Sequence, residues 1–280
     1  MSNNEVSSTA PSARPRPGSK ARVMRSATIS AVERLNRDLV RLHFEGEDLQ
    51  QFGPLEPTDS YVKIRFGDVT RTYTIRHHDP VEGRMVIDFV VHGAQGIAGP
   101  WAAAAQVGDQ ITFGGLGGAW HPDEAADHHI FIGDESAIPA IAAALDALPH
   151  TARATAFLEV ADESVRPPLR PLPGLEVVWV DRAPDGGSAA APYGVLLAHK
   201  VREAHFPQGR LSLFVHGNAE MIKDVRRNLF VERGLAKQDV SISGYWRTGL
   251  AEDDWQRTKR DFVAQMEREQ DQAQPAGDGA

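Results

Sequence analysis

The pattern of apolar residues changes near Pro122, and this change limits the chain to a fold of two parts. From Ala21 to about Trp120, apolar and polar residues alternate in short runs separated by Gly, Pro and Asp. Such period-two runs indicate antiparallel strands, and six of them at close spacing indicate a small barrel. They begin at Ala27, Leu39, Tyr61, Thr72, Met85 and Gln110. An Ala-rich segment from Gly96 to Gln106 predicts one helix within the barrel.

After Pro122, short β-branched runs alternate with helical segments, which predicts a parallel sheet wound on both faces, typical of nucleotide-binding domains. The predicted strands begin at His129, Thr155, Val177, Leu211 and Val240. The predicted helices run from Ala137 to Leu148, from Pro192 to Ala204 and from Ala219 to Arg233. A final helix, about Glu252 to Glu269, carries apolar residues along one face. These are Trp255, Phe262, Val263 and Met266.

The two ends of the chain have compositions that cannot offset the entropy of ordering the backbone. We therefore expect five segments. They are a disordered arm (1–20), a β-barrel domain (21–122), an α/β domain of the nucleotide-binding type (123–250), a C-terminal helix (251–270) and a disordered tail (271–280).

Composition excludes several classes of protein. Cysteine is absent, so disulfides, thiolate catalysis and cysteine-held iron–sulfur clusters are excluded, and any redox chemistry needs a bound organic cofactor. There is no run of about 20 apolar residues and no apolar signal core, which predicts a cytoplasmic protein without membrane insertion. A net charge of −8 argues against nucleic-acid binding. The histidines have no metal-binding spacing, so no metal site is predicted.

The segment Arg71-Thr72-Tyr73-Thr74-Ile75-Arg76 lies on a predicted barrel strand and suits a flavin. Arginine offers a forked donor to a pyrophosphate, a tyrosine ring can pack on an isoalloxazine plane, and a small hydroxyl can reach the flavin N5. Taken alone, the same letters also describe an ordinary half-exposed strand.

Downstream, Asp88-Phe89-Val90-Val91-His92 forms the next long strand and runs into a turn containing Gly93, Gly96 and Gly99, followed by Trp101. Glycines at a helix start let backbone amides approach a phosphate. The alternative is a loop that needs flexible turns, with Trp101 in the core. We favour the phosphate site, because it adjoins the predicted flavin strand.

In the second half, Gly133-Asp134-Glu135-Ser136 joins the first strand to its helix at the carboxyl edge of the sheet, where ligands bind in open α/β folds. It matches the glycine-rich dinucleotide fingerprint poorly, and Asp134 and Ser136 could simply cap the helix. At the same edge, Arg182 could meet the 2′-phosphate of NADPH, or be a solvated surface arginine, and Gly217 follows another strand.

After the last strand comes Gly244-Tyr245-Trp246-Arg247. Two adjacent aromatic residues are costly to leave exposed, so they pack either in the core or on a flavin ring. Their position beyond the last strand favours the flavin, because the cleft between the two domains opens there.

In this order, the segments resemble the siderophore-interacting protein family, FAD-dependent ferric-siderophore reductases built on the ferredoxin–NADP reductase plan. The resemblance spans about Val23 to Gly249. It implies that FAD is bound by Arg71, Thr72, Tyr73 and Thr74, by Asp88, Phe89, Val90, Val91 and His92, by Gly96, Ala98, Gly99 and Trp101, and by Gly244, Tyr245 and Trp246. The candidates for a nicotinamide site are the positions at the carboxyl edge of the second sheet, which are Gly133, Asp134, Glu135, Ser136, Arg182 and Gly217.

The expected activity is reduction of a ferric siderophore through FAD, with Thr74 and Tyr73 facing the chemistry. The family takes electrons from NADPH, NADH or a reduced ferredoxin, and the poor fingerprint at Gly133 leaves this choice open. Ferric siderophores are often anionic, which predicts a cationic rim at Arg76, Arg247, Lys259 and Arg260. The alternatives are a general NAD(P)H-dependent flavin or ferric-chelate reductase, and a siderophore-binding carrier without enzymatic activity.

Overall fold

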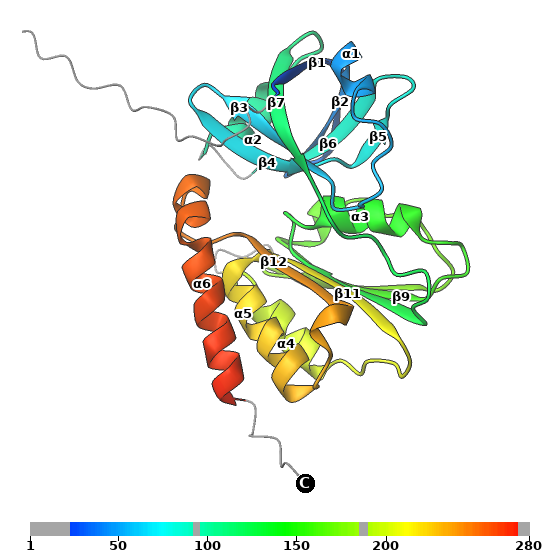
Figure 1. Cartoon of the computed structure of the whole chain (residues 1–280), viewed down its shortest axis with the longest axis vertical. Coiled ribbons are helices and arrows are strands. Elements are labelled where there is room, and N and C mark those ends of the chain that lie inside the picture. The colour runs from blue at the N-terminus through cyan, green and yellow to red at the C-terminus, as the bar shows by residue number, and fades with distance from the viewer. Residues whose placement is uncertain (1–22, 92–95, 185–189, 274–280) are drawn as a thin grey trace, which may run out of the picture.

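The computed structural model describes residues 23–91, 96–184 and 190–273, so His92 and Gly93 lie outside the described residues. Two sheets, one above the other, form the body of the molecule, and a long helix runs along one side (Figure 1). No helix among these residues is long and apolar enough to cross a membrane.

The first sheet is antiparallel and curls into a barrel-like shape, with the strand order β4-β3-β7-β1-β2-β6-β5. Its strands are β1 (Arg25–Asn36), β2 (Leu39–Glu45), β3 (Tyr61–Phe66), β4 (Val69–Thr74), β5 (His77–Asp79), β6 (Arg84–Val90) and β7 (Gln110–Gly117). Alternate residues such as Phe44, Ile64 and Phe113 fill its interior. Helices α1 (Glu47–Gln50) and α2 (Ala98–Ala104) interrupt the strands. The predicted antiparallel barrel is confirmed, with one strand more than predicted.

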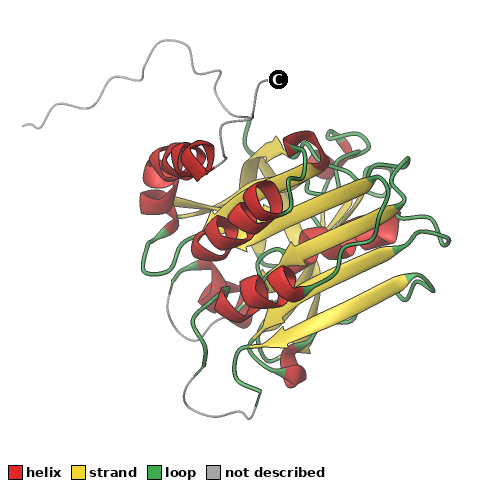
Figure 2. Ribbon diagram, turned by 90° about the horizontal axis from the view of Figure 1, so that it is seen from below, coloured by secondary structure: helices red, strands yellow, loops and turns green. Residues whose placement is uncertain are grey.

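The second sheet is parallel, with the strand order β10-β9-β8-β11-β12. Its strands are β8 (His128–Gly133), β9 (Ala154–Val160), β10 (Leu175–Asp181), β11 (Leu211–Asn218) and β12 (Val240–Trp246). Helix α3 (Ile138–Ala147) covers one face, and α4 (Val195–Glu203) and α5 (Ala219–Arg227) cover the other (Figure 1). Phe131 and Phe214 face α3, whereas their neighbours Ile132 and Val215 face α4 and α5. The predicted doubly wound sheet, shown from below in Figure 2, is confirmed.

Short helical turns complete this domain at Glu163–Val165, Asn228–Glu232 and Lys237–Asp239. The predicted helix from Ala219 to Arg233 is α-helical only as far as Arg227. It continues as a π-helical turn because the N–H of Arg233 bonds the carbonyl of Asn228, five residues earlier.

The C-terminal helix α6 (Glu252–Ala273) packs on the second domain through the predicted apolar face. Trp255 and Met266 are buried, and Phe262 and Val263 pack beside Met266. Trp255 lies on Gly244 of β12, where an added Cβ would be 3.1 Å from the indole ring. This docking brings the acidic start of α6 to the edge of the first sheet, where the candidate site begins.

Candidate functional site

Strand β4 lies at the edge of the first sheet and holds a carboxylate. The backbone N–H and the hydroxyl of Thr72 donate to Glu252 Oε1 at 3.2 and 3.0 Å. Arg71 Nη1 is 3.3 Å from Asp253 Oδ2, and its Nε is 3.7 Å from Glu252 Oε2. An edge strand leaves its outward N–H groups free for such a ligand. Arg71, predicted to hold a phosphate, and Thr72 therefore bind carboxylates of α6 in this structure, and their binding of a phosphate stays a prediction.

An aromatic cluster lies beside these donors. The ring centres of Tyr73 and Phe89 are 4.3 Å apart, and those of Phe89 and Trp101 are 5.7 Å apart. Burial, followed by the charge of Glu252, raises the pKa of Tyr73, so its hydroxyl stays neutral at physiological pH. Thr74 ends β4. The structure brings Arg71 to Thr74 together with Phe89 and Trp101, as a flavin site requires; their contact with flavin remains a prediction.

Asp88 differs from its predicted role. Its buried carboxylate accepts two bonds from Arg41, at 2.7 and 2.9 Å, and so joins β6 to β2. The two residues are register partners on adjacent strands, which explains the pairing. Because this carboxylate is occupied, the flavin contacts predicted for the segment fall to the neighbours of Asp88. Phe89 is buried, and Val90 and Val91 are partly buried.

The predicted glycine turn leads into α2. Gly96 has a φ of 84°, which favours glycine, and an added Cβ there would meet no atom within 4 Å. Ala98 begins the helix, Gly99 is partly buried, and Trp101 packs between Phe66 and Phe89. The side of Trp101 that contacts these two rings thus belongs to the core. Phosphate binding by the glycine turn remains a prediction.

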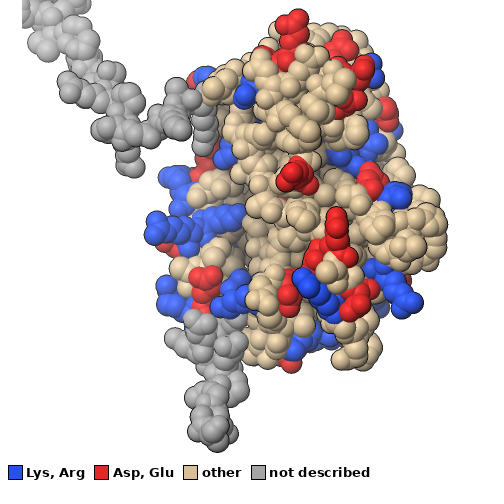
Figure 3. All heavy atoms as spheres, turned by 45° about the vertical axis from the view of Figure 1, so that its right-hand side comes forward, with Lys and Arg blue, Asp and Glu red and all other residues tan. Residues whose placement is uncertain are grey.

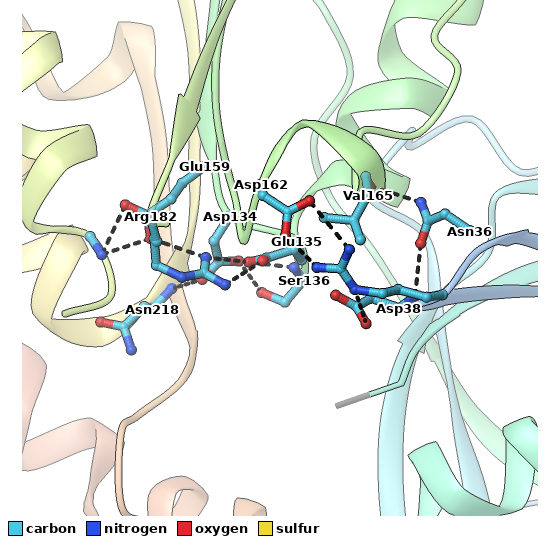
Figure 4. A network of polar contacts seen from close by, with 12 residues as sticks. Asn36, Asp38, Asp134, Glu135, Ser136, Glu159, Asp162, Val165, Arg182 and Asn218 are labelled. Carbon is cyan, nitrogen blue, oxygen red and sulfur yellow. Dashed lines mark hydrogen bonds and ion pairs between the residues drawn. The ribbon is translucent and has the colours of Figure 1, made fainter. Parts of the chain in front are cut away.

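Asp134 is a buried junction at the carboxyl edge of the second sheet (Figure 4). Its carboxylate accepts bonds from the N–H and hydroxyl of Ser136 at 3.0 and 2.5 Å. It also accepts the N–H of Asn218 and the indole N–H of Trp246, both at 2.8 Å. Burial, and then the charge of Glu135, raises its pKa. Asp134 therefore joins β8, β11 and β12, and Trp246, predicted to contact a flavin, has its N–H directed at this junction.

The glycines of this edge allow close packing. An added Cβ on Gly133 would lie 2.7 Å from the Cβ of Ala137, so glycine lets α3 approach β8. On Gly217, an added Cβ would lie 2.8 Å from the Asp134 carboxylate. Both positions were predicted to contact a nicotinamide, and the structure gives each a packing reason.

Replacing Gly217 with alanine should lower the free energy of unfolding by about 2 to 4 kcal/mol, through overpacking and a disfavoured φ. The φ of Gly217 is 141°, and the carboxylate that it faces is held by four bonds and cannot move easily. Urea denaturation measures the loss. Gly234→Ala is the control, because Gly234 also has a positive φ, 68°, but faces open space. Equal losses in the two variants would contradict the packing explanation.

Arg182 was predicted to be available to a 2′-phosphate, but it is 5% exposed and fully engaged. It forms two bonds with Glu135, at 2.9 and 2.6 Å, and lies 3.4 Å from Glu159. Its guanidinium also stacks over Tyr193, 4.0 Å from the ring centre. The prediction of an accessible cation at this edge is wrong, because Glu159 of β9 and Glu135, in the turn after β8, place two carboxylates beside it.

Glu159 should make stability depend on pH. Burial raises its pKa from 4.5 to about 7, although Gly194 N–H and Arg182 oppose the shift and Asp134 and Glu135 reinforce it. Between these pH values the folded state holds a proton that the unfolded state has lost, so stability falls as pH rises from about 4.5 to about 7. Relative to Glu159→Gln, the native chain should lose on the order of 2 kcal/mol across this interval. Urea denaturation of both proteins at several pH values measures the difference; a constant difference would contradict the assignment.

Tyr245 and Lys259 lie where β12 and α6 approach the barrel. Burial raises the pKa of Tyr245, which packs against His216 with ring centres 5.0 Å apart. Lys259 Nζ donates to the hydroxyl of Ser243 at 3.0 Å. Burial, and then the positive charge of Lys63, lowers the pKa of Lys259. Lys63 was not predicted as a site residue, because one lysine on an alternating strand carries no signal of its own.

The four predicted rim residues do not form one group. Arg76 forms an ion pair with Asp146 of α3, at 2.6 Å, and is largely buried. Arg247 bonds Glu220 at 2.8 Å and lies over the ring of Phe262. Lys259 and the exposed Arg260 line a shallow hollow along α6. Basic side chains gather along the left side of the face shown in Figure 3. The structure therefore places Arg247, Lys259 and Arg260 around α6, with Arg76 at the joint between domains.

Two family models match this chain, one in each of its two sheet domains. The model described as siderophore-interacting FAD-binding domain matches residues 67–120, and the model described as siderophore-interacting protein matches residues 126–249. The ferric vibriobactin reductase ViuB of Vibrio cholerae is 33% identical over 244 residues, covering 78% of this chain and 88% of that protein. An uncharacterised protein of Mycobacterium tuberculosis is 37% identical over 277 residues, covering 86% and 96%.

Solved structures show the same architecture. A siderophore utilization protein from T. fusca is 32% identical, with a TM-score of 0.71, covering 83% of this chain and 96% of that one. The siderophore-interacting protein SipS from Aeromonas hydrophila is 23% identical, with a TM-score of 0.73, covering 86% and 98%. The ferredoxin–NADP⁺ reductase of Plasmodium falciparum, 16% identical with a TM-score of 0.62 over 79% and 95%, shares the fold.

Proposed function

Because the chain belongs to the siderophore-interacting protein family, we propose that it is an FAD-dependent reductase of ferric siderophores that works in the cytoplasm. One observation supports this most: Arg71 and Thr72 hold an oxyanion at the edge of a barrel strand, next to the cluster of Tyr73, Phe89 and Trp101. Anion donors beside an aromatic surface suit the phosphates and the ring of FAD.

A bound flavin accepts electrons in pairs and releases them singly, as ferric iron requires. The chain itself supplies placement. Arg71 and Thr72 would hold the phosphates, Tyr73 would pack on the ring, and the hydroxyl of Thr74 would bond its N5 edge. Tyr73 can keep its orientation because Phe89 packs against it. When iron becomes ferrous it fits hard oxygen ligands less well, which favours its release.

The substrate side would lie about two turns along α6, where the positive charge of Lys63 contributes to lowering the pKa of Lys259. A partly buried pair of like charges is unfavourable unless an anion binds between them. Arg260 on the same helix is exposed and can extend this cationic surface. An anionic ferric chelate matches the pair, although the whole chain has a net charge of −8.

Replacing Lys259 with alanine should raise the KM for an anionic ferric siderophore about five- to tenfold at low ionic strength, because one attractive charge is lost. The value of kcat should change less, and added salt should shrink the effect. Steady-state kinetics at two salt concentrations measure both quantities. Arg257→Ala is the matched control, since Arg257 lies on the same helix but pairs with Asp254. An unchanged KM for Lys259→Ala would count against this rim.

The electron donor is proposed to be NADPH, NADH or a reduced ferredoxin. A direct test is to purify the protein, record its flavin absorption and add each donor without oxygen. A yellow protein bleached by one of them supports the reductase. A colourless protein that cannot be loaded with FAD but binds a ferric siderophore would instead favour a carrier. A bleached protein that reduces simple iron chelates as fast as siderophores would favour a general ferric reductase.

A further inference from the structure

The carboxyl edge of β8 is where an open α/β fold binds the diphosphate of a dinucleotide. In the usual fingerprint, a second glycine two residues after the first lets the backbone approach the diphosphate. Here Gly133 is followed two residues later by Glu135. The Glu135 side chain is 11% exposed and turns inward to Arg182. Glu135 therefore has a carboxylate side chain at the position where the fingerprint requires a glycine.

Several polar groups that could receive a phosphate at this edge already have partners within the part of the chain that the structure describes. Glu135 and Glu159 engage the guanidinium of Arg182. The N–H of Gly194, at the start of α4, donates to both oxygens of Glu159 at 2.9 and 3.1 Å. The N–H groups of Ser136 and Asn218 donate to Asp134. No donor named here is left for a ligand.

The charge of the edge also opposes an anion. Arg182 is the cation that Glu135 and Glu159 share, and Asp134, the residue before Glu135, adds a third buried carboxyl group to this edge (Figure 4). A diphosphate would have to displace Glu135 from Arg182 and leave that carboxylate buried without its partner. Such a loss is strongly unfavourable, because a buried charge depends on its pair.

We infer that Glu135, through its ion pair with Arg182, determines donor specificity by excluding the diphosphate and the 2′-phosphate of a nicotinamide dinucleotide from this edge. The edge then cannot distinguish NADPH from NADH. Whatever reductant serves the flavin is recognised by other surfaces. Glu135 acts on specificity by occupying space and by neutralising Arg182, and it takes no part in electron transfer.

Calorimetric titration of the full chain carrying its flavin tests this inference, with ADP-ribose and 2′-phospho-ADP-ribose as probes. Native protein should show no saturable binding below a Kd of about 1 mM. Glu135→Gly should bind 2′-phospho-ADP-ribose at least tenfold more tightly than native protein, because Arg182 is freed and the backbone is opened. Glu135→Gln, which keeps the side-chain volume, should gain less than Glu135→Gly.

Glu135→Gly leaves a buried arginine with one weaker partner, so folding is checked by its thermal transition. The double variant Glu135→Gly with Arg182→Met removes both charges and opens the same space. It should bind both probes alike, without preference for the 2′-phosphate. Native protein that binds either probe below about 1 mM would overturn the inference. So would a folded Glu135→Gly or double variant that gains no binding.

This inference concerns the donor side of the proposed reaction, but its test measures binding alone. It can therefore fail while the proposed reduction of ferric siderophores stands, and it can hold if that reduction is not observed.

Discussion

Replacing Arg182 with alanine should lower the free energy of unfolding by about 3 to 5 kcal/mol at neutral pH, the cost of breaking a buried ion pair. The change removes the cation that Glu135 and Glu159 share and leaves both carboxyl groups buried. It also removes the guanidinium that stacks on Tyr193. Urea denaturation followed by circular dichroism measures the loss. Arg182→Lys should recover part of it, because an ammonium keeps the charge but lacks the two-pronged geometry.

Arg202→Ala is the control for this prediction. Arg202 lies on α4 and pairs with Glu232 at 3.3 Å, but both side chains are substantially exposed. Exposed pairs contribute about 0 to 1 kcal/mol. If Arg182→Ala costs no more than Arg202→Ala, the network at the sheet edge is not the stabilising element described above.

Arg71→Ala should weaken FAD binding about 10- to 100-fold, as expected for losing one charge-assisted contact with a phosphate. Quenching of flavin fluorescence during titration of FAD-free protein measures the Kd. Arg65→Ala is the matched control, because Arg65 lies on the neighbouring strand β3, is exposed and bonds only the carbonyl of Gly67 among the bonds described.

Glu252 gives this prediction its sharpest test. Its carboxylate occupies the N–H and hydroxyl of Thr72 and lies near Arg71, so it competes for the groups that a phosphate would use. Glu252→Gln should therefore bind FAD more tightly than native protein, whereas Arg71→Ala binds it less tightly. Weaker binding in both variants would show that Glu252 supports the cofactor instead of competing with it.

Most of the fold could be predicted from the spacing of apolar residues. In the first half they recur at every second position, and in the second half short apolar strands alternate with helical segments. Both patterns can be recognised from residues close together in the sequence. The deviations are local. Strand β5 is three residues long, too short to show alternation. The π-helical turn after Arg227 depends on one backbone bond that residue types do not reveal.

The candidate site was less predictable, because its partners are far apart in the sequence. Residue types pointed to Arg71 as an anion donor, but they did not indicate that Thr72 would bind a carboxylate, and nothing nearby indicates Glu252, which lies 180 residues from Thr72. Arg182 looked like a surface arginine because a single position past a strand gives no sign of Glu159 on the adjacent strand β9 or of Glu135 after β8. Charge pairing across a parallel sheet depends on strand order, and that order is a property of the folded chain.

The most direct test of the proposed function follows one oxidation–reduction cycle without oxygen. Protein loaded with FAD is reduced with dithionite, separated from the excess and mixed with a ferric siderophore in the presence of a chromogenic ferrous chelator. We expect flavin absorption to return and ferrous iron to form in a ratio of about two per flavin, since the flavin stores two electrons. The same siderophore loaded with gallium, which cannot be reduced, should leave the flavin bleached. Reduced flavin that persists with the ferric siderophore as long as with the gallium complex would contradict the account.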